Sequence, residues 1–243
     1  MGKVMISANR MTVTFPILNS PNRSLKKAIL NASTGGKIGS DSRNHVIVTA
    51  LDELTFEIIP GERVALTGHN GSGKTTLLRT LAGVYAPTSG DLTIGGKISS
   101  LLDITVGMDY EATGVENIML RGILMGLTRS EIERRLDDIA AFADLGEYLY
   151  MPVRTYSSGM QLRLAFAVST AVKPDIILMD EWLSVGDAEF AAKAERRLQE
   201  LVEQASILVI ATHSEDLVKN LCNREIRLSH GTIVADLKAT MVA

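Results

Sequence analysis

Apolar and polar positions along this chain follow two different periods. Short continuous apolar runs bounded by glycine, proline or charged residues are typical of buried strands, and apolar residues three or four apart are typical of helices. The pattern predicts strands at residues 4–15, 51–59, 63–67, 91–94, 175–179, 207–211 and 225–228. It predicts helices at residues 76–82, 116–127, 130–145 and 158–172. The strands therefore form the core of an α/β fold, which a helical block at about residues 105–172 interrupts.

One segment departs from this pattern. Residues 16–44 are rich in serine, asparagine and glycine, and residues 35–42 are expected to form a loop. Within the segment, residues 24–31 have the pattern of a short capped amphipathic helix with Leu25, Ala28 and Ile29 on one face. We interpret the segment as an insertion between two core strands.

Composition narrows the classes of function. The 243 residues, 46% of them hydrophobic, suffice for one large core, and the formal net charge of −3 makes nucleic acid an unexpected partner. Cys222 is the only cysteine, which excludes an internal disulfide and suits a reducing compartment. The longest apolar stretches, residues 165–172 and 176–179, are far shorter than the roughly 20 residues of a membrane span. We expect a cytoplasmic protein that reaches a membrane only through a partner.

The sequence GHNGSGKT at residues 68–75 is a Walker A phosphate-binding loop between a predicted strand and a predicted helix. Its glycines allow consecutive backbone N–H groups and the positive end of the helix dipole to converge on an anion. Lys74 adds a positive charge, and the Thr75 hydroxyl is expected to contact Mg²⁺. The residues expected to bind the nucleotide phosphates are Gly68, His69, Asn70, Gly71, Ser72, Gly73, Lys74, Thr75 and Thr76.

Two carboxylates follow the apolar run at residues 175–179. Ligands of parallel α/β sheets bind at the carboxyl ends of the strands, so Asp180 and Glu181 are expected beside the phosphate loop. Asp180 is assigned to hold Mg²⁺ through water, because this ion keeps much of its hydration shell. Glu181 is assigned to polarise the water that attacks the γ-phosphate.

A second anion-binding helix start is predicted at residues 156–160, where two serines and a glycine precede an apolar helix. An ordinary N-cap is the alternative interpretation. Because one phosphate loop does not need a second in the same subunit, Ser157, Ser158 and Gly159 are expected to complete the site of another subunit.

In this order and spacing, the motifs resemble the nucleotide-binding subunit of an ABC transporter over essentially the whole chain. Residues 156–160 stand where that family has its LSGGQ signature, residues 184–187 match its D-loop, and His213 matches the histidine that contacts the γ-phosphate. The resemblance implies ATP and Mg²⁺ as cofactors and a head-to-tail homodimer, with Asp187 communicating across the interface. The implied catalytic residues are Lys74, Glu181 and His213.

The fold implied by the resemblance is a RecA-like P-loop NTPase core with an antiparallel β edge subdomain and an inserted α-helical subdomain. Residues 1–243 are expected to form a single ATP-binding domain. Its parts are the insertion at 16–44, the core at 45–104 and 173–243, and the helical subdomain with the signature at 105–172. We expect no C-terminal carbohydrate-binding domain of the kind that many extended members add.

The signature region and the residues after Glu181 are similar to the branch of the family that exports bacterial cell-surface polysaccharides, such as O-antigen, capsule, teichoic acid and galactan precursors. This branch has a lengthened N-terminal segment with a short helix near the membrane, to which we assign residues 25–30. A surface helix packed on its own domain is the alternative. The implied partners are a pair of integral membrane permease subunits that carry a lipid-linked polysaccharide. The chain would then lie at the cytoplasmic face of the inner or plasma membrane.

Two positions remain open within this resemblance. The family has a glutamine between the phosphate loop and the signature, whereas no glutamine occurs between Thr75 and Met160. Asp103 stands nearest to that place and resembles the acidic residue of polysaccharide exporters, so it is assigned to the metal site. Phe15 is assigned to stack on adenine, with an ordinary core aromatic as the alternative.

Other functions fit the sequence less well. Soluble ABC ATPases that act on DNA or ribosomes carry two cassettes or a long coiled-coil insertion, which 243 residues do not hold. Importers more often retain the glutamine and lack the insertion, and a drug or lipid exporter is a further alternative. A binding module without hydrolysis is disfavoured, because the lysine, both carboxylates and the histidine are all present.

Overall fold

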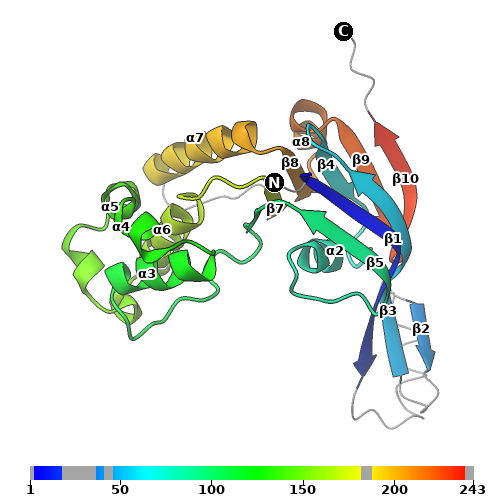
Figure 1. The fold of residues 1–243 in the computed structure, drawn as a ribbon, viewed down its shortest axis with the longest axis horizontal. Helices are drawn as coiled ribbons and strands as arrows, with labels where there is room; N and C mark the ends of the chain where they lie inside the picture. Colours follow the sequence, from blue (N-terminus) through cyan, green and yellow to red (C-terminus); the bar gives the residue numbers. More distant parts are fainter. Residues whose placement is uncertain (1–2, 18–36, 41–45, 182–187, 239–243) are drawn as a thin grey trace. The chain divides into compact units, whose positions relative to one another are not determined.

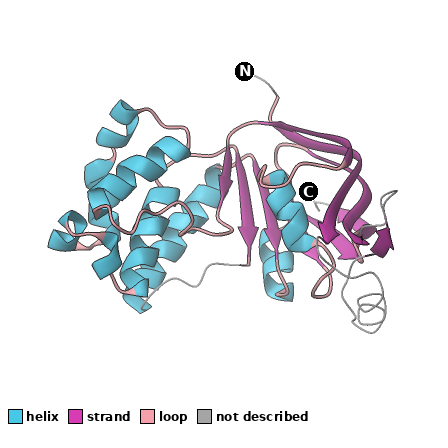
Figure 2. Cartoon of the chain, turned by 90° about the horizontal axis from the view of Figure 1, so that it is seen from below, coloured by secondary structure: helices cyan, strands magenta, loops and turns pink. Residues whose placement is uncertain are grey.

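The computed structural model describes residues 3–17, 37–40, 46–181 and 188–238. The chain divides into two compact units. Unit 1 comprises Met1–Ile98, Leu178–Trp182 and Ser206–Ala243, and unit 2 comprises Ser99–Ile177 and Leu183–Ala205. Figure 2 shows that one part of the chain is mostly helical and that the strands gather in another. This division assigns residues 183–205 to unit 2. The sequence instead predicts that all of residues 173–243 belong to the core.

Two sheets contain the strands (Figure 1). The strands are β1 (Met5–Ile17), β2 (Lys37–Ser40), β3 (Val46–Ile58), β4 (Arg63–Thr67), β5 (Ser89–Gly95), β6 (Ile98–Ser100), β7 (Ile176–Asp180), β8 (Ile207–Ala211), β9 (Arg224–Ser229) and β10 (Thr232–Lys238). One sheet has the order β2-β3-β1-β5, and its neighbouring strands pair antiparallel. The other has the order β10-β9-β4-β8-β7-β6, in which β4 pairs in parallel with β8 and β9. All of β8 is buried, which explains its continuous apolar run.

The helices of unit 1 follow the carboxyl ends of its central strands. Helix α2 (Lys74–Leu81) begins after the glycine loop that follows β4, and it contacts β3 and β8, one strand from each sheet. Helix α8 (Glu215–Leu221) begins after β8, where the Ser214 hydroxyl accepts a hydrogen bond from the backbone N–H of Leu217. The phosphate loop, the carboxylates at the end of β7 and the segment after β8 therefore meet at the carboxyl ends of the central strands of the second sheet.

Unit 2 is built around helix α6. Its elements are α3 (Gly114–Leu124), α4 (Arg129–Glu133), α5 (Leu136–Ala143), the 3₁₀ helices η1 (Gly146–Tyr150) and η2 (Val153–Thr155), α6 (Ser158–Ser169) and α7 (Ala188–Gln204). Helix α6 contacts α3 and α5, and its residues 164–169 are all buried. Capping boxes fix the starts of α3 and α4, through Thr113 with Glu116 and Thr128 with Glu131.

Two local predictions are wrong. Residues 37–40 form β2, which pairs with β3, whereas the glycine and serine content of residues 35–42 predicts a loop. A polar strand at a sheet edge needs only backbone partners, so it carries little apolar signal. The single helix predicted at residues 130–145 is divided into α4 and α5 at Arg134 and Arg135.

The strands predicted at residues 63–67 and 207–211 are confirmed with the same bounds. The helix predicted at residues 25–30 lies outside the described residues. Within the described ranges, no helix is long and apolar enough to cross a membrane.

Candidate functional site

The phosphate loop is shaped by glycines that no other residue can replace without strain. Gly68, Gly71 and Gly73 have φ angles of 136°, 77° and 111°, which L side chains rarely adopt. A Cβ atom on Gly68 would also lie 2.2 Å from the Leu228 carbonyl oxygen. The backbone between β4 and α2 is therefore held in a tight curve by its own chain.

Lys74 lies inside this curve. It is 8% exposed, and its ammonium group donates hydrogen bonds to the carbonyl oxygens of Gly68 at 2.7 Å and His69 at 3.2 Å. Burial lowers the pKa of Lys74, whereas the negative charges of Asp180 and Glu181 act in the opposite direction. The buried Ser72 hydroxyl oxygen has no hydrogen-bond partner among the described residues. The loop thus holds a cation and an unused polar group, as an anion-binding site requires.

Two residues beside the loop are joined by a hydrogen bond. The Thr75 hydroxyl, in the first turn of α2, donates to the Asp180 carboxylate at 2.9 Å. Asp180 is the last residue of β7 and is half-buried, whereas Thr75 is exposed. A hydroxyl and a carboxylate oxygen at this separation are ligands suited to Mg²⁺.

The Glu181 carboxylate is held at both of its oxygens. One oxygen accepts a hydrogen bond from the Thr212 hydroxyl and the other accepts one from the His213 backbone N–H, both at 3.0 Å. Glu181 has a φ angle of 65°, and its own N–H donates to the Ala211 carbonyl at 2.8 Å. A residue other than glycine in this conformation carries strain that is often found at functional sites. Thr212 is a residue that the sequence motifs did not single out.

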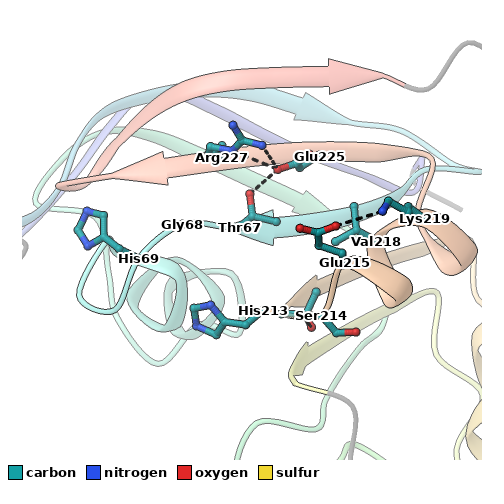
Figure 3. A pocket seen from close by; sticks show the side chains of 11 residues that line it. Thr67, Gly68, His69, His213, Ser214, Glu215, Val218, Lys219, Glu225 and Arg227 are labelled. Atoms are coloured by element: carbon teal, nitrogen blue, oxygen red, sulfur yellow. Dashed lines mark hydrogen bonds and ion pairs between the residues drawn. The ribbon is translucent and has the colours of Figure 1, made fainter.

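The His213 side chain is exposed, and within the described ranges its ring forms no hydrogen bond. A cavity of about 540 Å³ lies next to it (Figure 3). In the cavity, the Glu225 carboxylate accepts a hydrogen bond from the Thr67 hydroxyl at 2.6 Å and pairs with Arg227 at 2.9 Å, and these interactions lower the pKa of Glu225. Lys74 and both site carboxylates are absent from its lining, so the cavity adjoins the phosphate loop but is not the phosphate site. The lining residues are Thr67, Gly68, His69, Thr212, His213, Ser214, Glu215, Val218, Lys219, Glu225 and Arg227.

The signature turn lies in unit 2, at the start of α6. The Ser157 hydroxyl caps the helix by accepting a hydrogen bond from the Met160 N–H at 3.2 Å, and Ser157 and Ser158 are exposed. The preceding Tyr156 is buried, and its hydroxyl donates to the Tyr148 carbonyl at 2.5 Å. Outside the backbone of α6, the one described atom within 4 Å of a Cβ atom on Gly159 would be the Ser157 hydroxyl oxygen, at 3.9 Å.

Three further predicted site residues have different outcomes. Phe15 is half-buried on β1 and contacts the Tyr85 ring. Asp103 belongs to unit 2, in a turn where its carbonyl accepts a hydrogen bond from the Val106 N–H, so its place in a metal site with residues of unit 1 stays a prediction. Asp187 lies outside the described residues.

Comparison with known proteins identifies the family. The model of the ABC transporter family matches residues 51–184. The chain belongs to the ABC transporter family. The resemblance drawn from the motifs is thereby confirmed, and the family's phosphate loop, carboxylates and signature all fall within the matched range.

The relatives lie in the polysaccharide-export branch of the ABC transporter family. The chain is 44% identical over 223 residues to the O-antigen export system ATP-binding protein RfbE of Yersinia enterocolitica, covering 92% of this chain and 93% of that protein. It is 47% identical to the O-antigen export protein RfbB of Myxococcus xanthus, covering 75% of this chain and 42% of that protein. It is 37% identical to the teichoic acids export protein TagH of Bacillus anthracis, covering 94% of this chain and 40% of that protein. The chain therefore spans nearly all of the first relative and less than half of the other two.

Solved structures confirm the P-loop NTPase fold. The dimeric structure of MJ0796, a bacterial ABC transporter cassette, aligns with a TM-score of 0.68 at 22% identity and covers 97% of this chain and 99% of that one. The ATP-binding subunit of another ABC transporter aligns with a TM-score of 0.69 at 21% identity, covering 97% and 90%.

Proposed function

We propose that this chain is the ATP-binding subunit of an ABC exporter for a lipid-linked cell-surface polysaccharide. It hydrolyses ATP as a head-to-tail homodimer bound to a pair of permease subunits at the cytoplasmic face of the membrane. The observation that carries the proposal is the match to the Yersinia O-antigen export protein, which extends over 93% of that protein.

The phosphate loop fits a nucleotide. Phosphate oxygens can engage the Lys74 ammonium and the Ser72 hydroxyl, which has no hydrogen-bond partner in the described part of the chain. The curved backbone presents N–H groups at the start of α2. Thr75 and Asp180 would hold Mg²⁺, and Asp103 is assigned to the same ion. Mg²⁺ supplies positive charge against the charge that develops on the transferring phosphoryl group.

Glu181 is the proposed base. A carboxylate offers about four acceptor positions, and the Thr212 hydroxyl and the His213 N–H occupy one on each oxygen. These two bonds fix the orientation of the carboxylate, so its remaining positions can orient and polarise a water molecule. His213, with its exposed ring, is assigned to order the γ-phosphate, and Lys74 to neutralise it.

The signature turn supports the dimer. Neither a positive φ angle nor a crowded neighbour requires glycine at position 159, and the two serines beside it are exposed. The first N–H groups of a helix have no acceptor within the helix, so a helix start without an obstructing side chain suits an anion from outside the subunit. Ser157, Ser158 and Gly159 are therefore assigned to the partner's nucleotide, with Asp187 at the same interface.

Unit 2 has an apolar surface that suits a permease. Val106, Ile123 and Leu124 are 70%, 55% and 67% exposed. A Cβ atom on Gly107 would lie 3.3 Å from a methyl group of Leu124, so the turn with Val106 adjoins the end of α3. Contiguous exposed apolar side chains mark interaction surfaces, and we assign this one to a cytoplasmic segment of the permease.

Mixing two inactive variants tests the shared site. Lys74→Ala removes the phosphate-binding cation, and Ser158→Phe obstructs the signature turn, so each homodimer should hydrolyse almost no ATP. Each mixed dimer has one intact site, so an equal mixture should regain about a quarter of the parental rate under random association.

The matched control is an equal mixture of the single variants Lys74→Ala and Glu181→Gln. Both substitutions affect the half of the site that carries the phosphate loop, so each of the two sites in a mixed dimer has one defect. The mixture should therefore stay inactive. Absence of activity from the first mixture, when both variants fold and associate, would refute the shared site.

A further inference from the structure

The contact between Phe15 and Tyr85 joins two distant parts of unit 1. Their ring centroids are 5.0 Å apart and the ring planes are inclined by 75°. Phe15 lies on β1, whereas Tyr85 lies in the loop between α2 and β5. Both side chains are half-buried, so the pair lies at the surface rather than in the core. Edge-to-face pairs of this kind stabilise one relative orientation of two rings.

The loop that carries Tyr85 is tied to β1 by hydrogen bonds. The Thr88 N–H donates to the Thr12 carbonyl at 2.7 Å, and the N–H and hydroxyl of Thr14 donate to the Thr88 hydroxyl oxygen at 2.9 and 3.1 Å. The Tyr85 ring therefore has a fixed place beside Phe15 that needs no ligand.

The pair lies close to the phosphate loop. A Cβ atom on Gly73 would be 3.0 Å from the Leu51 side chain, so the loop contacts β3 at this residue. Leu51 pairs with Val13 of β1, and Val48 pairs with Phe15. Three residues of strand span about 10 Å. The ribose and α-phosphate of a nucleotide span a comparable distance between the base and the β-phosphate.

We propose that Tyr85 is a positioning residue for the nucleotide base, acting through Phe15. The Phe15 side chain is only half-buried and the two rings meet edge to face, so part of the Phe15 ring is exposed for stacking on a purine. Tyr85 limits the rotation of the Phe15 ring and thereby lowers the entropy lost when the base stacks. This inference rests on the proposed nucleotide-binding function.

The aromatic ring of Tyr85, and not its hydroxyl, is the relevant group. No described residue forms a hydrogen bond with that hydroxyl. Tyr85→Phe should therefore bind nucleotide as the parent does, whereas Tyr85→Ala removes the edge contact. Val84→Ala, in the same loop and at a side chain that is 64% exposed, is the matched control.

The test is calorimetric titration of the full chain with ADP and with inorganic pyrophosphate, which has no base. We expect Tyr85→Ala to weaken ADP binding by about fivefold to tenfold and to leave pyrophosphate binding unchanged. The KM for ATP should rise by a similar factor with little change in kcat. In a Phe15→Ala background, Tyr85→Ala should add nothing, because its partner ring is already gone.

Parental ADP affinity in Tyr85→Ala, equal weakening of ADP and pyrophosphate, or additive effects with Phe15→Ala would each overturn the inference. Tyr85→Leu, which keeps apolar bulk without an aromatic edge, repeats the test if the alanine variant does not fold. Lys74→Ala is titrated in parallel. Unchanged ADP binding there would refute the proposed function itself, independently of Tyr85.

Discussion

The phosphate loop of unit 1 and the signature turn of unit 2 each lead into a helix, yet their glycines have different neighbours. Gly68 has a φ angle of 136°, and a Cβ atom there would lie 2.2 Å from the Leu228 carbonyl oxygen. Gly159 lies within α6, where a Cβ atom would approach nothing closer than the Ser157 hydroxyl oxygen at 3.9 Å.

This difference separates what the fold requires from what a ligand requires. The chain itself requires glycine at position 68, so that glycine would be needed even without a nucleotide. Nothing described in the chain requires glycine at position 159, where alanine would favour the helix by roughly 0.5–1 kcal/mol. The absence of such a requirement among the described residues supports the role that we propose for Gly159 at the nucleotide of a second subunit.

The largest expected effect is on the stability of unit 1. Gly68→Ala should lower the free energy of unfolding by about 3 kcal/mol, because the new methyl group meets a backbone carbonyl and the left-handed conformation is strained. Urea unfolding of the nucleotide-free chain measures this change.

Gly83→Ala is the control for conformational strain alone. Gly83 also has a positive φ angle, 77°, but apart from its chain neighbours no atom of the described residues lies within 4 Å of the position of its Cβ. Its substitution should cost only about 1 kcal/mol. Equal losses in the two variants would show that the contact with Leu228 contributes nothing.

The second prediction concerns the signature turn. Gly159→Ala should leave stability unchanged or raise it by up to about 1 kcal/mol, and ADP should still bind to the phosphate loop. ATP hydrolysis should fall at least tenfold, since a methyl group at the start of α6 obstructs the approach of a phosphate to the backbone N–H groups. A parental rate of hydrolysis, measured as phosphate release, would contradict the role given to this turn.

The extent to which the sequence predicts this molecule depends on where each signal lies. Residues 63–67 and 207–211 are central strands buried on both faces, so their apolar runs mark their bounds directly. Strand β2 depends on backbone pairing with β3, which no local pattern reports. Arg135, which lies between α4 and α5, donates a hydrogen bond through its guanidinium to the Ala171 carbonyl, far along the chain. Non-local polar contacts of this kind are invisible to periodicity.

The functional site shows the same difference between local motifs, which the sequence predicts, and contacts between distant residues, which it does not. Lys74, Thr75, Asp180 and Glu181 belong to motifs whose spacing predicts their roles, and unit 1 brings them together. Thr212 was missed because its contact with Glu181 depends on the adjacency of β7 and β8, which are separated by a long stretch of sequence. Its only local signal is its position between a buried strand and His213. Tyr85 was missed for the same reason, since only the folded chain places it beside Phe15.

Buried arginines extend the comparison between the two units. Arg224 in unit 1 is 5% exposed and forms ion pairs with Glu62 at 2.8 Å and with Asp236 at 2.7 Å. The hydrogen bond to Asp236 is the main cause of the raised pKa of Arg224. Arg121 in unit 2 is 6% exposed and donates one hydrogen bond to the Ser169 hydroxyl at 3.0 Å. Its Nη1 atom has no partner in the described part of the chain, and burial lowers its pKa to about 10. The guanidinium of Arg121 is thus charged at neutral pH and poorly compensated.

The smallest predicted effect follows from this contrast. Arg121→Met keeps an unbranched apolar side chain and removes the buried charge, so it should raise the free energy of unfolding by about 1 kcal/mol. Ser169→Ala removes the hydroxyl that accepts the hydrogen bond from Arg121 and should cost about 1 kcal/mol in the parent, but almost nothing in the Arg121→Met background. Urea unfolding of the four chains measures both changes. A loss of stability in Arg121→Met, together with additive effects of the two substitutions, would contradict this prediction. It would mean that the packing of Arg121 between α3 and α6 stabilises unit 2 by more than its buried charge destabilises it.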